Sequence, residues 1–170
     1  MNKKTIKDID VKGKKVFVRV DYNVPFDDKM NITNDTRMVR TLPTLNYLLD
    51  GGAALILACH IGRPTEAKEE KFSTKHLVGH LSELLKKDVK WASDCVGPEA
   101  EKAAADLKPG EVLLLENLRY HKEEKKNDPA FAKQLASLAD IAVDDAFGVA
   151  HRAHASNVGI ASDLETVAGF

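Results

Sequence analysis

The sequence predicts an α/β fold: a doubly wound, Rossmann-like parallel sheet with helices on both faces, in three layers. Short apolar runs alternate with amphipathic segments along the chain, as strands and helices do around a parallel sheet. The runs are apolar at consecutive positions, which is typical of strands covered on both faces. A chain of 170 residues is long enough for one well-buried domain and short for two, so we expect residues 1–170 to form a single domain.

Four segments have the length and composition of buried strands, and Val89–Trp91 is a shorter, weaker candidate. The polar stretch 65–73 and the charged stretch 121–128 are expected to be surface loops. The four strands are expected at Val16–Val20, Ala54–His60, Val112–Glu116 and Ile141–Val143.

Helical patterns lie between the expected strands. Asn34 and Asp35 precede the first helix, Gly51-Gly52 follows it, and Asp128-Pro129 opens the last, which are ordinary start and stop signals. Pro43 falls inside the first helix, so we expect a kink or a restart there. The helices are expected at about Thr36–Leu49, Thr74–Lys86, Pro98–Leu107 and Pro129–Leu138.

Composition excludes several classes of protein. The net charge of -1 gives no general attraction to nucleic acid or to a membrane surface, so any anion site must be local. No apolar run approaches the length of a membrane span, and Met1–Lys4 does not resemble the start of a signal peptide. Cys59 lies in an expected core strand and Cys95 in an expected polar loop. Two thiols without a disulfide framework indicate a reducing cytoplasm and favour no metal site.

Polar and charged residues follow four of the expected strands. In a doubly wound sheet, ligands bind outside the carboxyl ends of the strands, so these residues are expected at one edge. They are Asp21 and Asn23 after the first strand, His60, Gly62 and Arg63 after the second, Arg119 and His121 after the third, and Asp144, Asp145, His151, Arg152 and His154 after the fourth.

The arginines are concentrated at these strand exits. The chain has 19 lysines but six arginines; Arg63, Arg119 and Arg152 follow strands, and Arg37 opens the helix after the first exit. The planar guanidinium binds phosphate or carboxylate through two parallel hydrogen bonds, which an ammonium group does not. Arg40 is interpreted as a charge on a helix face. The strand exits therefore predict a site for a small, multiply charged anion.

Each of these residues alone has a structural interpretation. His60 could be satisfied by backbone groups, Gly62 could mark a turn, and Asp21 and Asn23 could cap loop backbone. Arg19 lies within the first strand, on the face opposite its valines, and either a buried ion pair or a ligand contact fits it. Convergence at one edge of the sheet is what favours a binding site.

Several motifs are absent from the sequence. No G-x-G-x-x-G or G-x-x-x-x-G-K-[ST] is present, and no serine lies in a nucleophile elbow. His76 and His80 share a helix face, but no third ligand accompanies them in the sequence, which disfavours zinc. The chain is therefore expected to bind an anion without a nucleotide motif or a metal ligand of its own.

Five segments resemble the phosphoglycerate kinase family in order and spacing, over Lys4–Phe170. The resemblance covers the amino-terminal half of the family's chain. It implies a sheet domain that binds 3-phosphoglycerate or 1,3-bisphosphoglycerate, while the missing carboxyl-terminal half binds Mg²⁺ with ATP or ADP. The segments are "RVDYNVP" (19–25), "NDTR" (34–37), "HIGRP" (60–64), "LLLENLRY" (113–120) and "DDAFGVAHRAHAS" (144–156).

The resemblance also implies residue roles. Asp21 and Asn23 would contact the hydroxyl and carboxyl end of the substrate, and Arg37 would be the catalytic residue that stabilises the transferring group. Gly62 would let the backbone approach closely. The phosphate that is not transferred would be held by Arg63, Arg119 and Arg152 with His60 beside them, and the supporting basic patch would be Arg19, His151 and His154. No metal ligand is implied in this chain.

This sequence departs from the common family pattern at two positions. Asp144 stands where the family usually has asparagine, and Tyr22 stands where it usually has phenylalanine. The tyrosine is a mild change. The extra carboxylate of Asp144 adds negative charge near the expected anion site, so we expect it to weaken anion binding.

Three classes of function are weighed: the substrate half of a kinase, a stand-alone module that binds a phosphorylated metabolite, and a structural domain whose arginines serve ion pairs. Motif order and spacing favour the first. The end of the chain at Ala168–Phe170 suggests a cut inside a longer protein. A cytoplasmic monomer is expected, partnered by its own nucleotide domain, with no nucleic acid or membrane partner and no turnover by itself.

Overall fold

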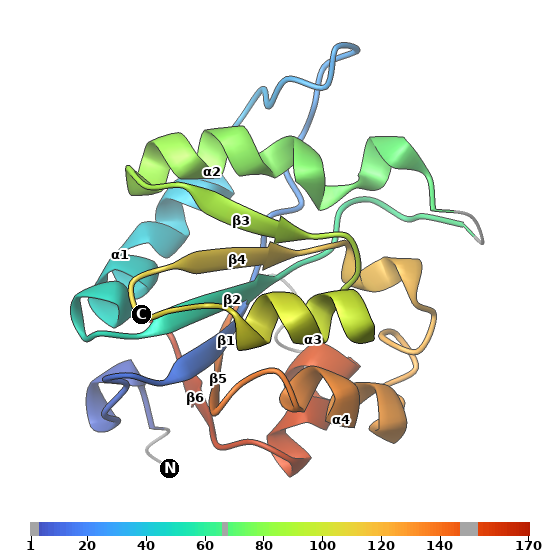
Figure 1. Cartoon of the computed structure of the whole chain (residues 1–170). Coiled ribbons are helices and arrows are strands. Elements are labelled where there is room, and N and C mark those ends of the chain that lie inside the picture. Colours follow the sequence, from blue (N-terminus) through green and yellow to red (C-terminus); the bar gives the residue numbers. More distant parts are fainter. Residues whose placement is uncertain (1–3, 66–67, 147–152) are drawn as a thin grey trace.

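The computed structural model describes residues 4–65, 68–146 and 153–170 (Figure 1). Within these residues, six strands form one sheet in the spatial order β3-β4-β2-β1-β5-β6, and all neighbouring strands are parallel. The predicted doubly wound α/β fold is confirmed, and the weak strand candidate is present as β3. The strands are β1 (Lys15–Val20), β2 (Ala54–Ala58), β3 (Val89–Ala92), β4 (Val112–Leu115), β5 (Ile141–Asp145) and β6 (Thr166–Ala168).

Helices cover both faces of the sheet, which gives the predicted three layers (Figure 1). Buried residues of α1 and α2 pack with one face of the sheet, and those of α3 and α4 pack with the other. Continuous burial on both faces explains why the strands are apolar at consecutive positions. The helices are α1 (Thr36–Asp50), α2 (Val78–Leu85), α3 (Pro98–Ala105) and α4 (Pro129–Ala136).

The central strand β1 shows how the two cores are built. Val16, Val18 and Val20 contribute to one core, whereas Phe17 contributes to the other, because successive side chains of a strand point to opposite faces. Arg19 lies on the same face as Phe17. A charged side chain is therefore placed in the middle of a buried sheet, where it needs partners.

The helix boundaries follow the expected signals with two differences. Helix α1 runs unbroken through Pro43 and does not restart there. The segment expected as one helix from Thr74 begins as a 3₁₀ turn, Thr74–Leu77, before α2. Asp128 accepts a hydrogen bond from the Phe131 amide at 3.0 Å and so caps α4 as predicted.

Two features of the fold were not expected from the sequence. Strand β6 was not predicted, and it adds to the edge of the sheet by pairing with β5. Cys95 was expected in a polar loop, but the residue is fully buried against the core beneath α3 and α4. No helix in the described part of the chain is long and apolar enough to cross a membrane.

Candidate functional site

The exits of β1 and β2 are joined by a direct hydrogen bond. The Gly62 amide donates to Asn23 Oδ1 at 3.0 Å. Gly62 has φ +59°, and a Cβ at this position would clash with the ring of Phe72. Only glycine fits this left-handed, closely packed turn without strain. The structure therefore brings Asn23 and Gly62 together, as the sequence predicts for residues that follow neighbouring strands.

Arg37 extends across the exit of β1 from the first turn of α1. Its Nη1 donates to Asp21 Oδ1 at 3.2 Å and to the Asn23 carbonyl at 3.0 Å. The side chain is 50% exposed, and its Nε and Nη2 have no hydrogen-bond partner within residues 4–65, 68–146 and 153–170. Asp21 thus positions one edge of the guanidinium and leaves the other for a ligand.

A small cavity lies beside Arg37. It has a volume of about 300 Å³, and its lining includes Asn23, Asn34, Arg37 and Arg40. Arg40 was interpreted as a plain charge on the helix face; it is exposed, as that interpretation requires, but it also lines this cavity. Two arginines from successive turns of α1 therefore give this cavity a positive wall.

The exit of β4 is tied to the exit of β2 by Asn117. Its Nδ2 donates to the carbonyls of Ile61 and Phe72, both at 2.9 Å, and its Oδ1 accepts from the Arg119 amide at 3.0 Å. Asn117 is fully buried, so all of these bonds are sheltered from water. Sequence analysis did not assign this residue a role. Its position directly after a buried strand and two residues before an arginine was the available signal.

Glu116 is a second framework residue that sequence analysis did not single out. It is buried, and its carboxylate accepts hydrogen bonds from Ser73 Oγ at 2.7 Å and from the amides of Thr74 and Asn117 at 2.8 Å. A buried carboxylate is stable when several donors satisfy it. Glu116 therefore fixes the segment between β2 and α2 against the end of β4.

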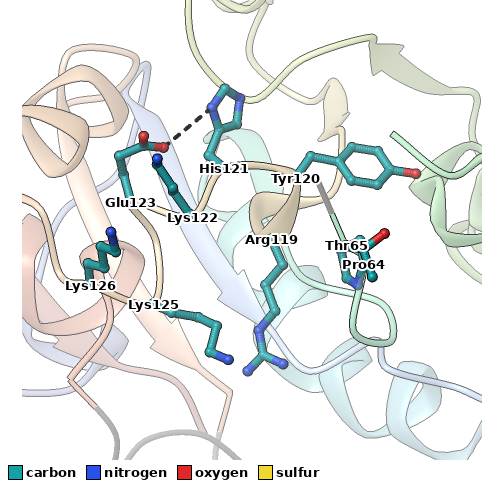
Figure 2. A pocket seen from close by; sticks show the side chains of 9 residues that line it. All are labelled: Pro64, Thr65, Arg119, Tyr120, His121, Lys122, Glu123, Lys125 and Lys126. Atoms are coloured by element: carbon teal, nitrogen blue, oxygen red, sulfur yellow. Dashed lines mark ion pairs between the residues drawn. The ribbon is translucent and has the colours of Figure 1, made fainter. Parts of the chain in front are cut away.

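A larger cavity of about 790 Å³ lies against the segment after β4 (Figure 2). In Figure 2 the Arg119 guanidinium and the Lys125 ammonium point toward one another, whereas Lys126 points away. None of the three lysines in this wall forms an ion pair within the described part of the chain. The cavity wall is thus strongly positive. It is lined by Pro64, Thr65, Arg119, Tyr120, His121, Lys122, Glu123, Lys125 and Lys126.

Arg19 is held very differently from Arg37. The residue is 1% exposed, and its Nε donates to Ser156 Oγ at 2.9 Å and lies 3.9 Å from a carboxylate oxygen of Glu124. Its Nη2 donates to His60 Nδ1 at 2.9 Å. Because arginine has no acceptor, Nδ1 of His60 accepts and carries no proton.

The buried ion pair, one of the two interpretations open for Arg19, is therefore present in the structure. The expected membership of Arg19 in a supporting basic patch stays a prediction, and its burial places it behind the cavity walls rather than in their lining. Glu124 lies in a stretch that was expected to be a surface loop, yet it is fully buried and also accepts from the Ser156 amide at 2.8 Å. A desolvated guanidinium requires such a carboxylate, which explains the difference.

The remaining predicted residues are distributed around this edge. Arg63 is exposed and forms no ion pair with any described residue. His60 and His154 are both 4% exposed, so both rings are inside the protein. His151 and Arg152 lie outside the described residues.

Two neighbouring carboxylates end β5. Asp144 Oδ1 accepts from the Ala146 amide at 3.1 Å. Asp145 is buried, and Thr44 Oγ1 donates to it at 3.1 Å. Burial raises the pKa of Asp145 to about 6, although the Thr44 hydrogen bond acts in the opposite direction. No cation is among the groups that shift the pKa of Asp145, which are Thr44 and the neighbouring carboxylate of Asp144.

Comparison with known proteins identifies the family of this chain. The sequence model of phosphoglycerate kinase matches residues 6–170. A phosphoglycerate kinase of Desulforudis audaxviator is 54% identical over 170 residues, covering 100% of this chain and 43% of the relative. The cytosolic phosphoglycerate kinase of Triticum aestivum is 59% identical over 167 residues, covering 98% of this chain and 41% of that protein.

Solved structures give the same result. The crystal structure of phosphoglycerate kinase from Pyrococcus horikoshii superposes with a TM-score of 0.88 at 37% identity, covering 98% of this chain and 42% of that chain. The corresponding structure from Coxiella burnetii gives a TM-score of 0.86 at 35% identity. The chain thus spans about two fifths of the length of the relatives that it matches. From its sequence match and its fold together, the chain belongs to the phosphoglycerate kinase family.

Proposed function

We propose that this chain is the acid-substrate half of a phosphoglycerate kinase, which binds 3-phosphoglycerate or 1,3-bisphosphoglycerate at the carboxyl edge of its sheet. The observation that carries the proposal is the contrast among its arginines. Arg37 and Arg119 line cavities at this edge, whereas Arg19 is buried against Glu124. Arg37 meets Asp21 through Nη1 only, and the three lysines in the cavity wall beside Arg119 form no ion pair among the described residues, so both walls keep positive charge that suits an anionic ligand.

The proposed roles are those that the family resemblance implies for the side chains at this edge. Asp21 and Asn23 receive the hydroxyl and carboxyl end of the substrate, where Asp21 already orients Arg37. Gly62 keeps the backbone close to the ligand. The phosphate that is not transferred is held by Arg63, Arg119 and Arg152, with His60 beside them.

The chemistry needs little from the protein beyond position and charge. The substrate carboxylate is itself a nucleophile, so no general base has to remove a proton. Catalysis of phosphoryl transfer is then largely alignment and neutralisation of charge on the transferring group. Arg37, held by Asp21 and half exposed, is the residue that supplies this neutralisation.

The nucleotide and Mg²⁺ are proposed to bind the remainder of a longer protein. Mg²⁺ takes oxygen ligands. Among the described residues, one cluster of three side chains could hold a metal ion: Asp94, Cys95 and His121. It contains a thiol and an imidazole, which Mg²⁺ does not favour. When bound with nucleotide, Mg²⁺ would neutralise phosphate charge. The whole protein is proposed to be a cytoplasmic monomer.

Calorimetric titration of the chain with 3-phosphoglycerate tests the proposal. We expect a dissociation constant of roughly millimolar, about 4 kcal/mol, because a half-site leaves its arginines in solvent. Affinity should fall as salt is added, since charges in an open cavity are screened. Arg119→Gln should weaken binding, whereas Lys108→Gln, at an exposed position of the opposite edge, should leave it unchanged.

Equal loss of binding in both variants would mean that attraction is non-specific and would remove the support for this site. A coupled assay with ATP, Mg²⁺ and 3-phosphoglycerate should show no rate above the blank. Robust turnover by this chain alone would contradict the proposed division between two halves. Tight binding with no dependence on Arg37 or Arg119 would instead favour a stand-alone metabolite-binding module.

A further inference from the structure

A cluster of three different metal-binding side chains, Asp94, Cys95 and His121, shares His121 with the wall of the larger cavity and contains none of the arginines described above. Asp94 and Cys95 lie between β3 and α3, and His121 follows the 3₁₀ turn Leu118–Tyr120. One ligand atom from each residue lies within 4.8 Å of the other two. Segments that are separate in the sequence thus bring a carboxylate, a thiol and an imidazole to one point.

The side chains of this cluster are held in place by the surrounding structure. His121 Nε2 lies 2.7 Å from Asp94 Oδ1, and the Cys95 amide donates to the same oxygen at 2.7 Å. The imidazole also stacks against Phe131, with the ring centroids 5.2 Å apart. Cys95 is fully buried, so its sulfur faces the interior rather than bulk water.

The second nitrogen of His121 has its own carboxylate. Nδ1 lies 3.9 Å from Glu123 Oε2, the ion pair drawn in Figure 2, while Nε2 faces the cluster. Histidines that bind metals commonly present one ring nitrogen to the metal and the other to a carboxylate, which fixes the ring and raises its basicity. Glu123 lies on the matching side of His121, at an ion-pair distance rather than a hydrogen-bond distance.

We propose that Asp94, Cys95 and His121 form a binding site for Zn²⁺ or a similar divalent metal, with water as the fourth ligand. Thiolate, imidazole and carboxylate together favour zinc and cobalt over magnesium and calcium. Metal–ligand bonds of about 2.0–2.3 Å place donor atoms about 3.3–3.8 Å apart in a tetrahedral site. The three donor atoms already lie within 4.8 Å of one another, about 1 Å more than this spacing at the widest.

Binding exchanges protons for the metal in a defined way. The Cys95 thiol releases its proton to solvent. His121 takes the neutral tautomer with its hydrogen on Nδ1, toward Glu123, so that Nε2 and the Asp94 carboxylate exchange their mutual contact for two metal bonds. Because a thiol must lose its proton to bind a metal, protons compete with the metal for Cys95. Lys68 lies 3.7 Å from Asp94 Oδ2 and therefore competes with a metal ion for this carboxylate. Glu123 faces the other ring nitrogen of His121. Metal affinity should therefore rise with pH.

Titration with Co²⁺ as a spectroscopic probe tests the site. A thiolate–cobalt bond gives a charge-transfer band in the near ultraviolet, and tetrahedral Co²⁺ gives intense visible bands. We expect both at pH 8, weaker bands at pH 6, and reversal by added Zn²⁺. Cys95→Ala should abolish the near-ultraviolet band, whereas Cys59→Ala, the matched control at the other buried cysteine, should keep it.

A second variant keeps the test decisive if Cys95→Ala does not fold. His121→Gln removes a ligand from the partly exposed side of the site and should weaken Co²⁺ binding about 10–100-fold or more. The proposal is wrong if the folded chain gives no thiolate band at millimolar Co²⁺, or if the band survives in Cys95→Ala or is unaffected by His121→Gln. These outcomes do not depend on 3-phosphoglycerate, so this proposal and the proposed function can fail separately.

Discussion

Arg19 and Arg119 both belong to the carboxyl edge of the sheet, yet their surroundings are opposite. Arg19 is 1% exposed and has a carboxylate, a hydroxyl, a carbonyl and an imidazole as partners. Arg119 is partly exposed and faces a cavity of about 790 Å³ whose nearest charged neighbour in view is Lys125 (Figure 2). One arginine is paired inside the folded core, and the other lines a cavity wall in which cations outnumber carboxylates.

The difference shows that the same residue type can stabilise the fold in one place and be available for ligand binding in another. A guanidinium taken out of water must be paired, and its partner becomes part of the folded core. A guanidinium in a cavity wall retains some solvent and can exchange it for a ligand. We therefore expect Arg19 to contribute mainly to stability and Arg119 mainly to anion binding.

The largest expected effect comes from Arg19→Met. This substitution leaves the buried carboxylate of Glu124 without its cation, and breaking a buried pair costs about 3–5 kcal/mol. Urea unfolding should show this loss in the free energy of unfolding. Arg119→Met is the matched control and should change the free energy of unfolding by less than about 1 kcal/mol. Similar losses in both variants would contradict the division of roles.

Gly62→Ala should have the next largest effect. The left-handed backbone at φ +59° costs a residue with a Cβ about 1–2 kcal/mol, and the clash with Phe72 adds to this. Gly13→Ala measures the cost of the left-handed backbone alone. Gly13 has φ +71°, but no atom lies within 4 Å of a Cβ added there. Equal destabilisation of the two variants would show that packing against Phe72 does not hold the Gly62 turn.

Asp145 extends the comparison to a buried carboxylate that forms no ion pair among residues 4–65, 68–146 and 153–170. Its pKa is raised from 3.8 to about 6, so the folded chain binds this proton more tightly than the unfolded chain. The contribution of Asp145 to stability should therefore fall as pH rises from about 4 to about 7 and then level off, by about 2–3 kcal/mol in total.

Asp145→Asn keeps a side-chain acceptor for Thr44 and removes the proton. The difference in free energy of unfolding between the wild type and this variant, measured from pH 4 to pH 8, isolates the carboxylate. A difference that does not change across this range would contradict the account of Asp145.

The smallest expected effect concerns Lys125. Its ammonium points toward Arg119, so Lys125→Gln should weaken binding of 3-phosphoglycerate about twofold to fivefold, the range of an exposed charge contact of about 0.4–1 kcal/mol. Lys126→Gln makes the same charge change on the same segment, but its side chain points away. An equal effect of the two variants would indicate that the ligand is attracted by the overall positive charge of this segment rather than by direct contact with Lys125.

Much of the fold could be predicted because strands that are buried on both faces are apolar at consecutive positions. The strands β1, β2 and β4 are nearly continuous apolar runs, and each occurs where predicted. Strand β6 has three residues, of which only Val167 is buried. Such a short edge strand is defined by its pairing with β5 rather than by its own composition.

Part of the candidate site could be predicted for a topological reason. Parallel strands end at the same edge, so Asn23 and Gly62 had to be neighbours once both strands were assigned. The pairing of Arg19 with Glu124 could not be predicted, because it joins the middle of a strand to a charged stretch typical of a surface loop. The framework bonds of Asn117 likewise depend on carbonyl positions that only the folded chain defines.

The most direct test of the account is a titration of the isotopically labelled chain with 3-phosphoglycerate, followed by amide chemical shifts. The account predicts that the largest shifts occur at the strand exits, at Asn23, Gly62 and Arg119, and that they are smaller at raised ionic strength. The turns that contain Gly51 and Gly110 precede β2 and β4 at the opposite edge and should stay unchanged. Shifts confined to Gly51 and Gly110, with none at Asn23, Gly62 or Arg119, would contradict an anion site at the carboxyl edge of this sheet.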